Sequence, residues 1–214
     1  MDLFGDERKP AWTLFEELAL RRGYTCIAGI DEAGRGALAG PVVAAAVVFP
    51  KGVTIPGIND SKKLTPGKRE ELFELIRQGA LAVGVGSGDH LLVDRINILQ
   101  ATLAAMKQAV LSIEPLPDYL LIDGISKIPL TIHQQTIKKG DSASISIAAA
   151  SIIAKVTRDR LMVGFDQQYP GYGFAEHKGY GCAAHLAAIA KLGPCVIHRK
   201  TFRGVKEHIR NAEC

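Results

Sequence analysis

The sequence has no apolar run long enough to cross a membrane. Its longest uncharged apolar stretch, residues 37–49, holds 13 residues and contains a proline, whereas a spanning helix needs about 18 to 20 apolar residues. Residues 1–12 carry neither the basic leader nor the apolar core of a secretory signal. We therefore expect no membrane anchor and a cytoplasmic protein.

Cysteines are also scarce, and none stands in a C-x-x-C pair that would indicate zinc or dithiol chemistry. The sequence contains no internal repeat and no low-complexity segment. Because the cytoplasm keeps thiols reduced, we expect four free thiols: Cys26, Cys182, Cys195 and Cys214.

Charge of both signs is present but unevenly spread. Residues 151–214 carry 10 Lys and Arg against 5 Asp and Glu, while residues 1–150 carry 16 against 17. A basic segment suits a polyanion such as nucleic acid, because phosphate contacts release counterions. An excess of this size is equally typical of an ordinary solvated surface, so the charge alone does not identify a partner.

Hydrophobic residues make up 47% of the 214-residue chain, which suits one compact domain. Apolar β-branched runs predict strands, and apolar residues at helical spacing predict helices. The expected strands are residues 26–31, 41–49, 81–86, 118–123 and 129–135. The expected helices are residues 64–79, 91–112, 142–165 and 182–192, after a short helix within residues 1–22. This order indicates an α/β fold with a mixed central sheet flanked by helices and a small helical C-terminal part.

Carboxylates stand at the ends of two predicted strands and at the start of one predicted helix. Asp31, with Glu32 beside it, and Asp123 follow apolar runs, and sites commonly form at the carboxyl ends of strands. Asp141 precedes the helix at 142–165, so it is either part of a site or an N-cap worth about 1 kcal/mol. The strand-end acids alone could be turn residues that bond local amides. As a cluster they suit Mg²⁺ or Mn²⁺, and two such ions about 4 Å apart support nuclease chemistry.

A glycine-rich loop between the first two predicted strands matches the dinucleotide-binding pattern G-x-G-x-x-G/A at residues 34–39. That fold requires a helix directly after the loop, but the next segment is GPVVAAAVVF, which predicts a strand. We therefore reject a dinucleotide site. Gly34 and Gly36 would instead let backbone groups approach a ligand, such as a sugar hydroxyl, next to Asp31.

Eight segments, in order, resemble the bacterial ribonuclease HII family from about residue 25 to 205: IAGIDEAGRGALAGPVVAAAVV, INDSKKL, INILQAT, LLIDG, KKGDSAS, IAAASIIAKVTRDRLM, HKGYG and PCVIHR. The resemblance implies an RNase H-like catalytic domain at residues 23–214, after an N-terminal helical extension at residues 1–22. It also implies an endonuclease that hydrolyses the RNA strand of RNA/DNA hybrids. In ribonucleotide-containing DNA duplexes it would cut 5′ to the ribonucleotide, leave 3′-hydroxyl and 5′-phosphate ends, and so serve ribonucleotide removal.

The same resemblance implies the site residues. It implies a centre of four carboxylates that holds Mn²⁺ or Mg²⁺: Asp31, Glu32, Asp123 and Asp141. Gly34, Arg35 and Gly36 match the family segment that reads the 2′-hydroxyl. Tyr180 matches the tyrosine that packs on the ribose at the junction of RNA and DNA, although from sequence alone it could be an aromatic that caps the core.

Other polar residues have weaker assignments. Candidate phosphate contacts, any of which could be an ordinary solvated side chain, are Lys62, Lys63, Lys178 and Arg199. Asp159 lies between Arg158 and Arg160, where we expect an ion pair and not a metal ligand. We expect His177 to bond backbone groups of its own loop.

Two other functions, and a protein partner besides nucleic acid, are also compatible with parts of the sequence. Ribonuclease HIII carries an extra amino-terminal domain, whereas about two dozen residues precede the predicted site here. A non-catalytic module that holds hybrids through the basic C-terminal part would not need all four carboxylates. The segment at residues 2–4 is similar to the end of peptides that dock on bacterial sliding clamps, although it lacks their upstream glutamine and could be a flexible acidic start. Apart from this possible clamp, we expect a monomer whose partner is nucleic acid.

Overall fold

The computed structural model describes residues 13–58, 61 and 64–209. The predicted phosphate contacts Lys62 and Lys63, the clamp-like segment at residues 2–4, and Cys214 lie outside the described residues. The strands are β1 (Ile27–Ala33), β2 (Val42–Val48), β3 (Ala82–Gly88), β4 (Tyr119–Asp123) and β5 (His133–Ile137). The helices are α1 (Leu14–Arg21), α2 (Pro66–Gly79), α3 (His90–Leu111), α4 (Ile145–Gln168), α5 (Phe174–His177) and α6 (Ala183–Leu192), with 3-10 turns at η3 (Gly140–Ser142) and η4 (Lys206–His208).

The five strands form one mixed sheet in the order β3-β2-β1-β4-β5, which confirms the predicted α/β fold. β2 is antiparallel to both β1 and β3. β4 is parallel to β1 and to β5. Because β1 and β4 are parallel neighbours, their carboxyl ends meet at the same edge of the sheet, and this edge carries Asp31 and Asp123.

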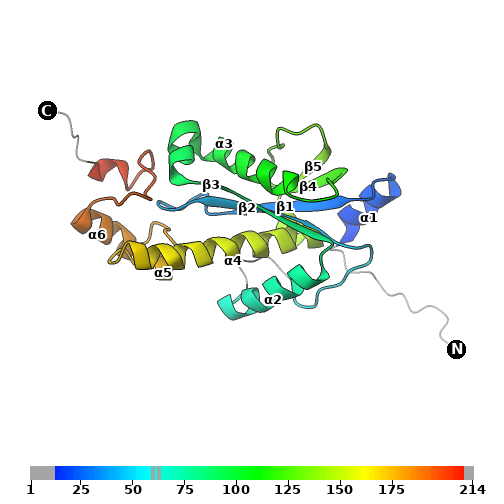
Figure 1. The fold of residues 1–214 in the computed structure, drawn as a ribbon, viewed down its shortest axis with the longest axis horizontal. Helices are drawn as coiled ribbons and strands as arrows, with labels where there is room; N and C mark the ends of the chain where they lie inside the picture. The colour runs from blue at the N-terminus through cyan, green and yellow to red at the C-terminus, as the bar shows by residue number, and fades with distance from the viewer. Residues whose placement is uncertain (1–12, 59–60, 62–63, 210–214) are drawn as a thin grey trace.

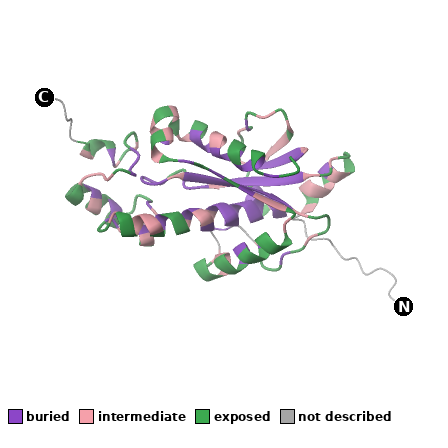
Figure 2. Ribbon diagram, in the orientation of Figure 1, coloured by how far each residue is buried: buried purple, intermediate pink, exposed green. Residues whose placement is uncertain are grey.

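Helices cover both faces of the sheet (Figure 1): α3 packs on one face, and α4 with α2 packs on the other. Alternate side chains of β2 serve the two layers, since Ala44 and Ala46 contact the α3 side while Ala45 and Val47 contact the α4 side. Figure 2 shows the buried residues concentrated in the strands and along the inner face of α4. Burial on both faces explains why β2 is apolar throughout and β4 is apolar up to Asp123.

Close packing of α4 on the sheet depends on a missing side chain. A Cβ on Gly29 in β1 would lie 2.2 Å from the carbonyl carbon of Ser146. The backbone of α4 can therefore approach β1 closely enough for its later residues to reach the strand end. No described helix is both long and apolar enough to span a membrane.

Two of the boundaries that differ from the prediction are explained by side-chain hydrogen bonds. The expected strand at 129–135 begins only at His133, because the Gln134 amide bonds the loop backbone, accepting from the N–H of Ile128 at 2.8 Å and donating to its carbonyl at 3.0 Å. The expected helix at 142–165 begins at Ile145, after an N-cap at Ser144 whose Oγ accepts from the N–H of Ile147 at 3.2 Å.

The helix of the predicted N-terminal extension packs against the body of the protein. Ala19 of α1 is 2% exposed in a cluster with Ile27 and Tyr119. The Glu16 carboxylate accepts hydrogen bonds from the Ser144 hydroxyl at 2.5 Å and from the N–H of Ser146 at 3.1 Å. α1 therefore helps to satisfy the first amides of α4.

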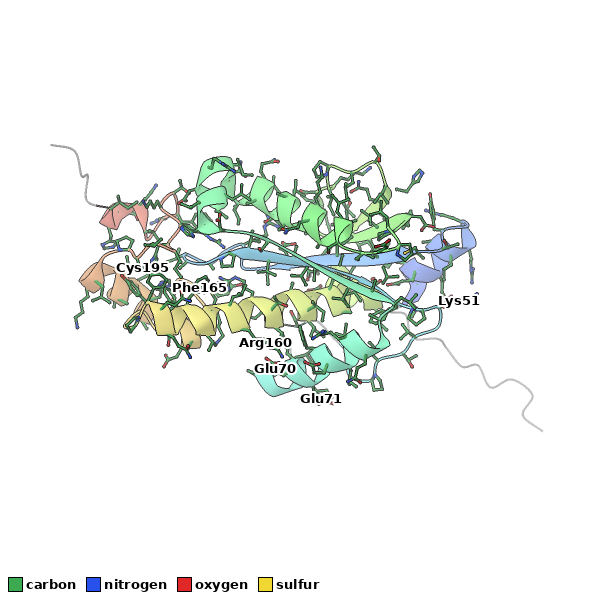
Figure 3. All side chains as sticks on the ribbon, viewed as in Figure 1. Lys51, Glu70, Glu71, Arg160, Phe165 and Cys195 are labelled. Carbon is green, nitrogen blue, oxygen red and sulfur yellow. The ribbon has the colours of Figure 1, made fainter. Side chains whose placement is uncertain are left out.

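The C-terminal part forms a small helical unit at the end of α4. Phe174 and Met162 are fully buried in its core, and Phe165 and Cys195 pack around them. Figure 3 shows Phe165 and Cys195 at the end of the molecule opposite Lys51. Segments far apart in the sequence therefore meet beside the glycine-rich loop between β1 and β2, because Ala39 belongs to the same cluster.

Candidate functional site

Three of the predicted carboxylates come together at the carboxyl ends of β1 and β4. One oxygen from each of Asp31, Asp123 and Asp141 lies within 4.8 Å of the others. Asp31 is 4% exposed and Asp141 is 6% exposed, while Asp123 is half-buried. Parallel pairing of β1 with β4 places the first two, and the η3 turn after β5 brings Asp141 to them.

Burial and mutual repulsion act on Asp31. Burial is the largest cause that raises its pKa well above the ordinary value, and the charges of Glu32 and Asp123 raise the pKa further. Hydrogen bonds from the Glu32 N–H, at 2.7 Å, and from Ser151 of α4 oppose this shift. An uncompensated carboxylate cluster of this kind favours a cation or a proton in its centre.

Backbone geometry holds the other two acids. Asp123 accepts a hydrogen bond from the N–H of Gly140 at 2.7 Å, which ties the end of β4 to the η3 turn. Lys139, just before that turn, has a left-handed conformation with φ of 56°. Asp141 lies inside the turn, and Ser144 is the N-cap of α4. The interpretation of Asp141 as the helix N-cap is therefore wrong.

Glu32 lies beside the three aspartates but is not a member of the group whose oxygens converge. Its carboxylate accepts from the Arg35 guanidinium at 3.1 Å, and the two side chains are 13% and 50% exposed. The charge of Glu32 nevertheless acts on Asp31, since it contributes to the raised pKa there. Arg35 thus ties the glycine-rich loop to the acidic centre.

The loop after β1 is held against the segment that contains Tyr180. Gly34 has φ of 96°, a conformation that a side chain would strain. An isolated antiparallel bridge pairs Ala37 with Tyr180, and the N–H of Leu38 donates to the carbonyl of Gly179 at 2.8 Å. The next element is the strand β2, which confirms the rejection of a dinucleotide-binding loop.

Tyr180 lies partly open, with 37% of its surface exposed. The guanidinium carbon of Arg158 lies 5.3 Å from the centre of its ring, and the Lys155 Nζ lies 5.8 Å from it. Lys155 also pairs with Asp159 at 2.6 Å, which confirms the ion pair predicted for Asp159. Tyr180 therefore has cations beside its ring and an accessible part that faces solvent.

Two buried arginines were missed by the sequence interpretation. Arg199, predicted as a phosphate contact, is 0% exposed and donates to the carbonyls of Gly34, Arg35 and Gly40. A phosphate cannot reach it, so that prediction is wrong. Arg158 is also 0% exposed. No local pattern predicts its burial, because Arg158 lies in the charged run KVTRDR at residues 155–160, which is typical of a solvated helix face.

Lys178 and His177 make local contacts in the loop before Tyr180. The Lys178 Nζ donates to the carbonyl of Ala175, and the Lys178 side chain also lines a groove of about 550 Å³ between α2 and α4. The His177 Nε2 bonds the carbonyl of Tyr172 at 2.8 Å, and its Nδ1 accepts from the N–H of Gly179 at 3.2 Å. The predicted backbone role of His177 is confirmed.

A chain of hydrogen bonds through two buried histidines ends at Tyr180. The Cys195 N–H donates to His198 Nδ1 at 2.9 Å, so a neutral His198 carries its proton on Nε2. That proton faces His185 Nε2 at 3.1 Å, which leaves His185 Nδ1 to donate to the Tyr180 carbonyl at 3.0 Å. Burial, together with the charges of neighbouring histidines, lowers the pKa of each histidine from 6.5 to about 4.

We expect the stability of the protein to fall as the pH decreases from about 6.5 to 4. In this window both histidines are protonated in the unfolded chain, whereas buried His185 and His198 stay neutral in the folded protein. The free energy of unfolding therefore drops by up to about 1.4 kcal/mol per pH unit for each histidine. Urea denaturation at several pH values measures the slope. As a control, the variant His133→Gln at an exposed position should keep the wild-type slope of stability against pH. His185→Gln should reduce this slope. An unchanged slope in His185→Gln would show that His185 does not contribute to the pH dependence.

The donor set of the acidic centre suits a hard divalent cation. Asp31, Asp123 and Asp141 offer only carboxylate oxygens, and Mg²⁺ and Mn²⁺ prefer oxygen ligands. The raised pKa of Asp31 records a repulsion that a cation would relieve. Residues and chemistry therefore fit a divalent metal centre at the edge of the sheet.

The family model and the sequence relatives agree on one family. The family model described as Ribonuclease HII matches residues 28–205. A relative named Ribonuclease HII, from Geotalea uraniireducens, is 70% identical over 213 residues, covering 100% of this chain and 99% of the relative.

Solved structures are also similar. The ribonuclease H2 from Pyrococcus horikoshii has a TM-score of 0.71 at 27% identity, covering 86% of this chain and 96% of that chain. The RNase HII in a PCNA complex from Archaeoglobus fulgidus has a TM-score of 0.70 at 26% identity, covering 84% and 96% of the two chains.

Proposed function

The chain belongs to the ribonuclease HII family, and from that membership we propose that its acidic cluster is the centre at which it hydrolyses RNA. The enzyme is a ribonuclease H that acts on the RNA strand of RNA/DNA hybrids and on DNA duplexes that contain ribonucleotides. The observation that carries the site assignment is the convergence of Asp31, Asp123 and Asp141 within 4.8 Å. Glu32 completes the proposed set of four carboxylates.

The family depends on divalent metal ions, and we assign their binding here to Asp31, Asp123 and Asp141, with Glu32 beside them. Two Mg²⁺ or Mn²⁺ ions held by these carboxylates would supply Lewis acidity and a water poised for in-line attack on phosphorus. The product ends would then be a 3′-hydroxyl and a 5′-phosphate. Ser151 and the Glu32 N–H orient the Asp31 carboxylate, and the Gly140 N–H orients Asp123.

Selection of the ribose is assigned to the loop of Gly34, Arg35 and Gly36 together with Tyr180. The loop follows Asp31 and Glu32 directly, so a sugar bound there would have its phosphate near the acidic centre. The bridge between Ala37 and Tyr180 supports this assignment, because it holds both elements at one place. The 2′-hydroxyl is the sugar group that distinguishes RNA from DNA.

Two grooves near this point are lined in part by basic residues that could contact phosphates. A groove of about 630 Å³ begins at Gly36 and Gly181 and includes Arg203 and His208. The groove of about 550 Å³ beside α4 includes Lys178, which we retain as a proposed phosphate contact. Phosphate contacts of this kind would position the substrate without reading its sequence.

The decisive experiment is a cleavage assay on a duplex with one embedded ribonucleotide, run with Mg²⁺, with Mn²⁺ and with a chelator. We expect cleavage 5′ to the ribonucleotide with either ion and none with the chelator. Metal-independent cleavage would overturn the proposed centre. The same assay decides between Mg²⁺ and Mn²⁺ at equal concentrations.

For the Asp141→Asn variant we expect a loss of about tenfold to a hundredfold in kcat, or ~1.4 to 2.7 kcal/mol, with recovery at higher metal concentration. Loss of one charged oxygen weakens metal binding but leaves the other carboxylates in place. Isothermal titration with Mn²⁺ should show weaker binding, while the exposed Glu114→Gln variant should match wild type. Unchanged metal affinity in Asp141→Asn would remove this residue from the centre.

A contact with a sliding clamp is proposed from the sequence of residues 2–4. The ribonuclease HII from Archaeoglobus fulgidus was solved in a PCNA complex, and this supports a proposed contact of residues 2–4 with a sliding clamp. That segment lies outside the described residues.

We further propose that the enzyme is a monomer in the cytoplasm, where it takes part in ribonucleotide removal from DNA. We also propose that residues 1–22 form an extension to the catalytic domain at residues 23–214.

A further inference from the structure

Two fully buried guanidinium groups lie beside the ribose-reading loop. Arg158 and Arg199 are each 0% exposed. Within the part of the chain that the structure describes, neither forms an ion pair with a carboxylate. Burial lowers the pKa of both, that of Arg199 to about 9. A buried charge destabilises a protein unless it is well hydrogen-bonded. Both guanidinium groups meet this requirement through bonds to backbone carbonyls.

Arg158 connects the two elements assigned to ribose selection. Its guanidinium donates to the carbonyls of Ala39 at 3.1 Å and Pro41 at 2.8 Å, at the end of the glycine-rich loop, and to that of Lys178 at 2.9 Å, two residues before Tyr180. Its Cζ lies 5.3 Å from the centre of the Tyr180 ring. One side chain therefore holds both elements at a fixed separation.

Arg158 also packs directly against the loop. A Cβ on Gly34 would lie 2.0 Å from Arg158 Nε. The absence of a side chain at Gly34 thus serves a contact inside the protein, in addition to its positive φ. Any displacement of the guanidinium would free Gly34 to move toward the space that it leaves.

Arg199 fixes the orientation of the loop from within. It donates to the carbonyls of Gly34 at 2.8 Å and Arg35 at 2.9 Å. In a trans peptide the N–H points opposite to the carbonyl, so the amides of Arg35 and Gly36 are directed away from Arg199. Both of these residues are exposed, and neither amide donates to another group among the described residues. Two neighbouring donors are thereby presented to a ligand oxygen.

We propose that Arg158 and Arg199 are positioning residues for ribose selection: Arg199 turns the Arg35 and Gly36 amides toward the sugar, and Arg158 sets the distance from this loop to Tyr180. The inference rests on the proposed roles of the loop and of Tyr180. Neither arginine touches the substrate. Each buried guanidinium bonds three carbonyls through three separate nitrogens, those of Arg199 within the glycine-rich loop and those of Arg158 in the loop and at Lys178. A lysine ammonium carries its three donors on a single nitrogen and cannot reach all three carbonyls.

The test uses Arg158→Lys and Arg199→Lys, which keep the charge but cannot reproduce the three hydrogen bonds. Steady-state assays measure kcat and KM on a duplex with one ribonucleotide and on a continuous hybrid. For Arg158→Lys we expect the ratio of kcat/KM on the two substrates to shift at least about tenfold against the single ribonucleotide, mostly in kcat, because phosphate contacts still supply most of the affinity. Arg199→Lys should lower kcat on both substrates.

A core variant separates positioning from general destabilisation. Leu72→Ala in α2 removes a fully buried side chain that belongs neither to the loop nor to the segment of Tyr180, and it should lose stability without changing the substrate ratio. If Arg158→Lys changes the ratio no more than Leu72→Ala does, the positioning role is overturned. If Arg158→Lys does not fold, the Arg199→Lys result decides, and a wild-type kcat there would overturn the proposal.

A double-mutant comparison identifies which inference fails. If Arg158 acts through Tyr180, then adding Arg158→Lys to Tyr180→Ala should cause no further change in the substrate ratio. Additive shifts would mean that Arg158 acts independently, against the proposal. If Tyr180→Ala alone leaves the ratio unchanged, the assigned role of Tyr180 fails first; if only Arg158→Lys leaves it unchanged, the positioning role alone fails.

Discussion

Asp31→Asn and Asp123→Asn should each reduce cleavage to less than about 1% of wild type, a rise of at least ~2.7 kcal/mol in the activation barrier. Each change removes a charged oxygen from the proposed metal centre. Hybrid binding should stay equal or become tighter, because less negative charge faces the phosphates. Cleavage rates and filter-binding affinity on the same hybrid measure the two effects separately. Activity above a few per cent in either variant would refute the site assignment.

Asp31→Asn also has an expected effect that does not depend on catalysis. Burial and neighbouring carboxylates raise the pKa of Asp31, so its ionised form destabilises the folded protein at neutral pH. In the presence of a chelator, Asp31→Asn should therefore have a higher melting temperature than wild type. Added Mn²⁺ should raise the melting temperature of wild type more than that of the variant. A lower melting temperature of the variant in the chelator would contradict the repulsion inferred for this cluster.

Tyr180→Ala should lose at least about tenfold more kcat/KM on a single embedded ribonucleotide than on a continuous RNA strand paired to DNA, a difference of ~1.4 kcal/mol or more. The ring is partly exposed beside the loop of Gly34 to Gly36, where it can pack on the sugar that follows the ribonucleotide. A deoxyribose accepts this contact, whereas a second 2′-hydroxyl would crowd the ring. Continuous RNA therefore has less of this contact to lose.

Tyr180→Phe is the matched variant, because it keeps the ring and removes only the hydroxyl. We expect it to retain the wild-type preference between the two substrates. Equal losses on both substrates in Tyr180→Ala would show that the residue supports the fold alone. Loss of the preference in Tyr180→Phe would assign the effect to the hydroxyl and not to packing of the ring.

The sequence by itself predicted the sheet and most of its helices, because these depend on local patterns. Apolar β-branched runs mark the buried strands, and Thr65 followed by Pro66 marks the start of α2, where Thr65 Oγ1 accepts from the N–H of Lys68 at 3.3 Å. The strand-end position of Asp31 and Asp123 was also visible, since each directly follows an apolar run. Either acid alone could be a turn residue, and only their occurrence together predicted a metal site. Family motifs then supplied the activity.

Boundaries that depend on distant partners were predicted less well. β5 starts four residues later than expected, because the Gln134 side chain bonds the loop before it. Asp141 precedes a helix in sequence, yet Ser144 caps that helix. A capping pattern allows either residue, and only the η3 turn, fixed by the bond from Gly140 to Asp123, decides between them.

Tertiary structure alone decided the burial of the two arginines. Composition counts Arg158 and Arg199 in a basic C-terminal segment, as if they faced solvent, but both are 0% exposed. Their partners are backbone carbonyls, which every residue has and which leave no mark in the sequence. The pairing of Arg199 with Gly34 and Arg35 joins positions about 165 residues apart. The sequence determined which carboxylates are candidates for a metal centre. The fold determined which buried cations hold the glycine-rich loop, because that depends on where backbone carbonyls meet side chains from distant segments.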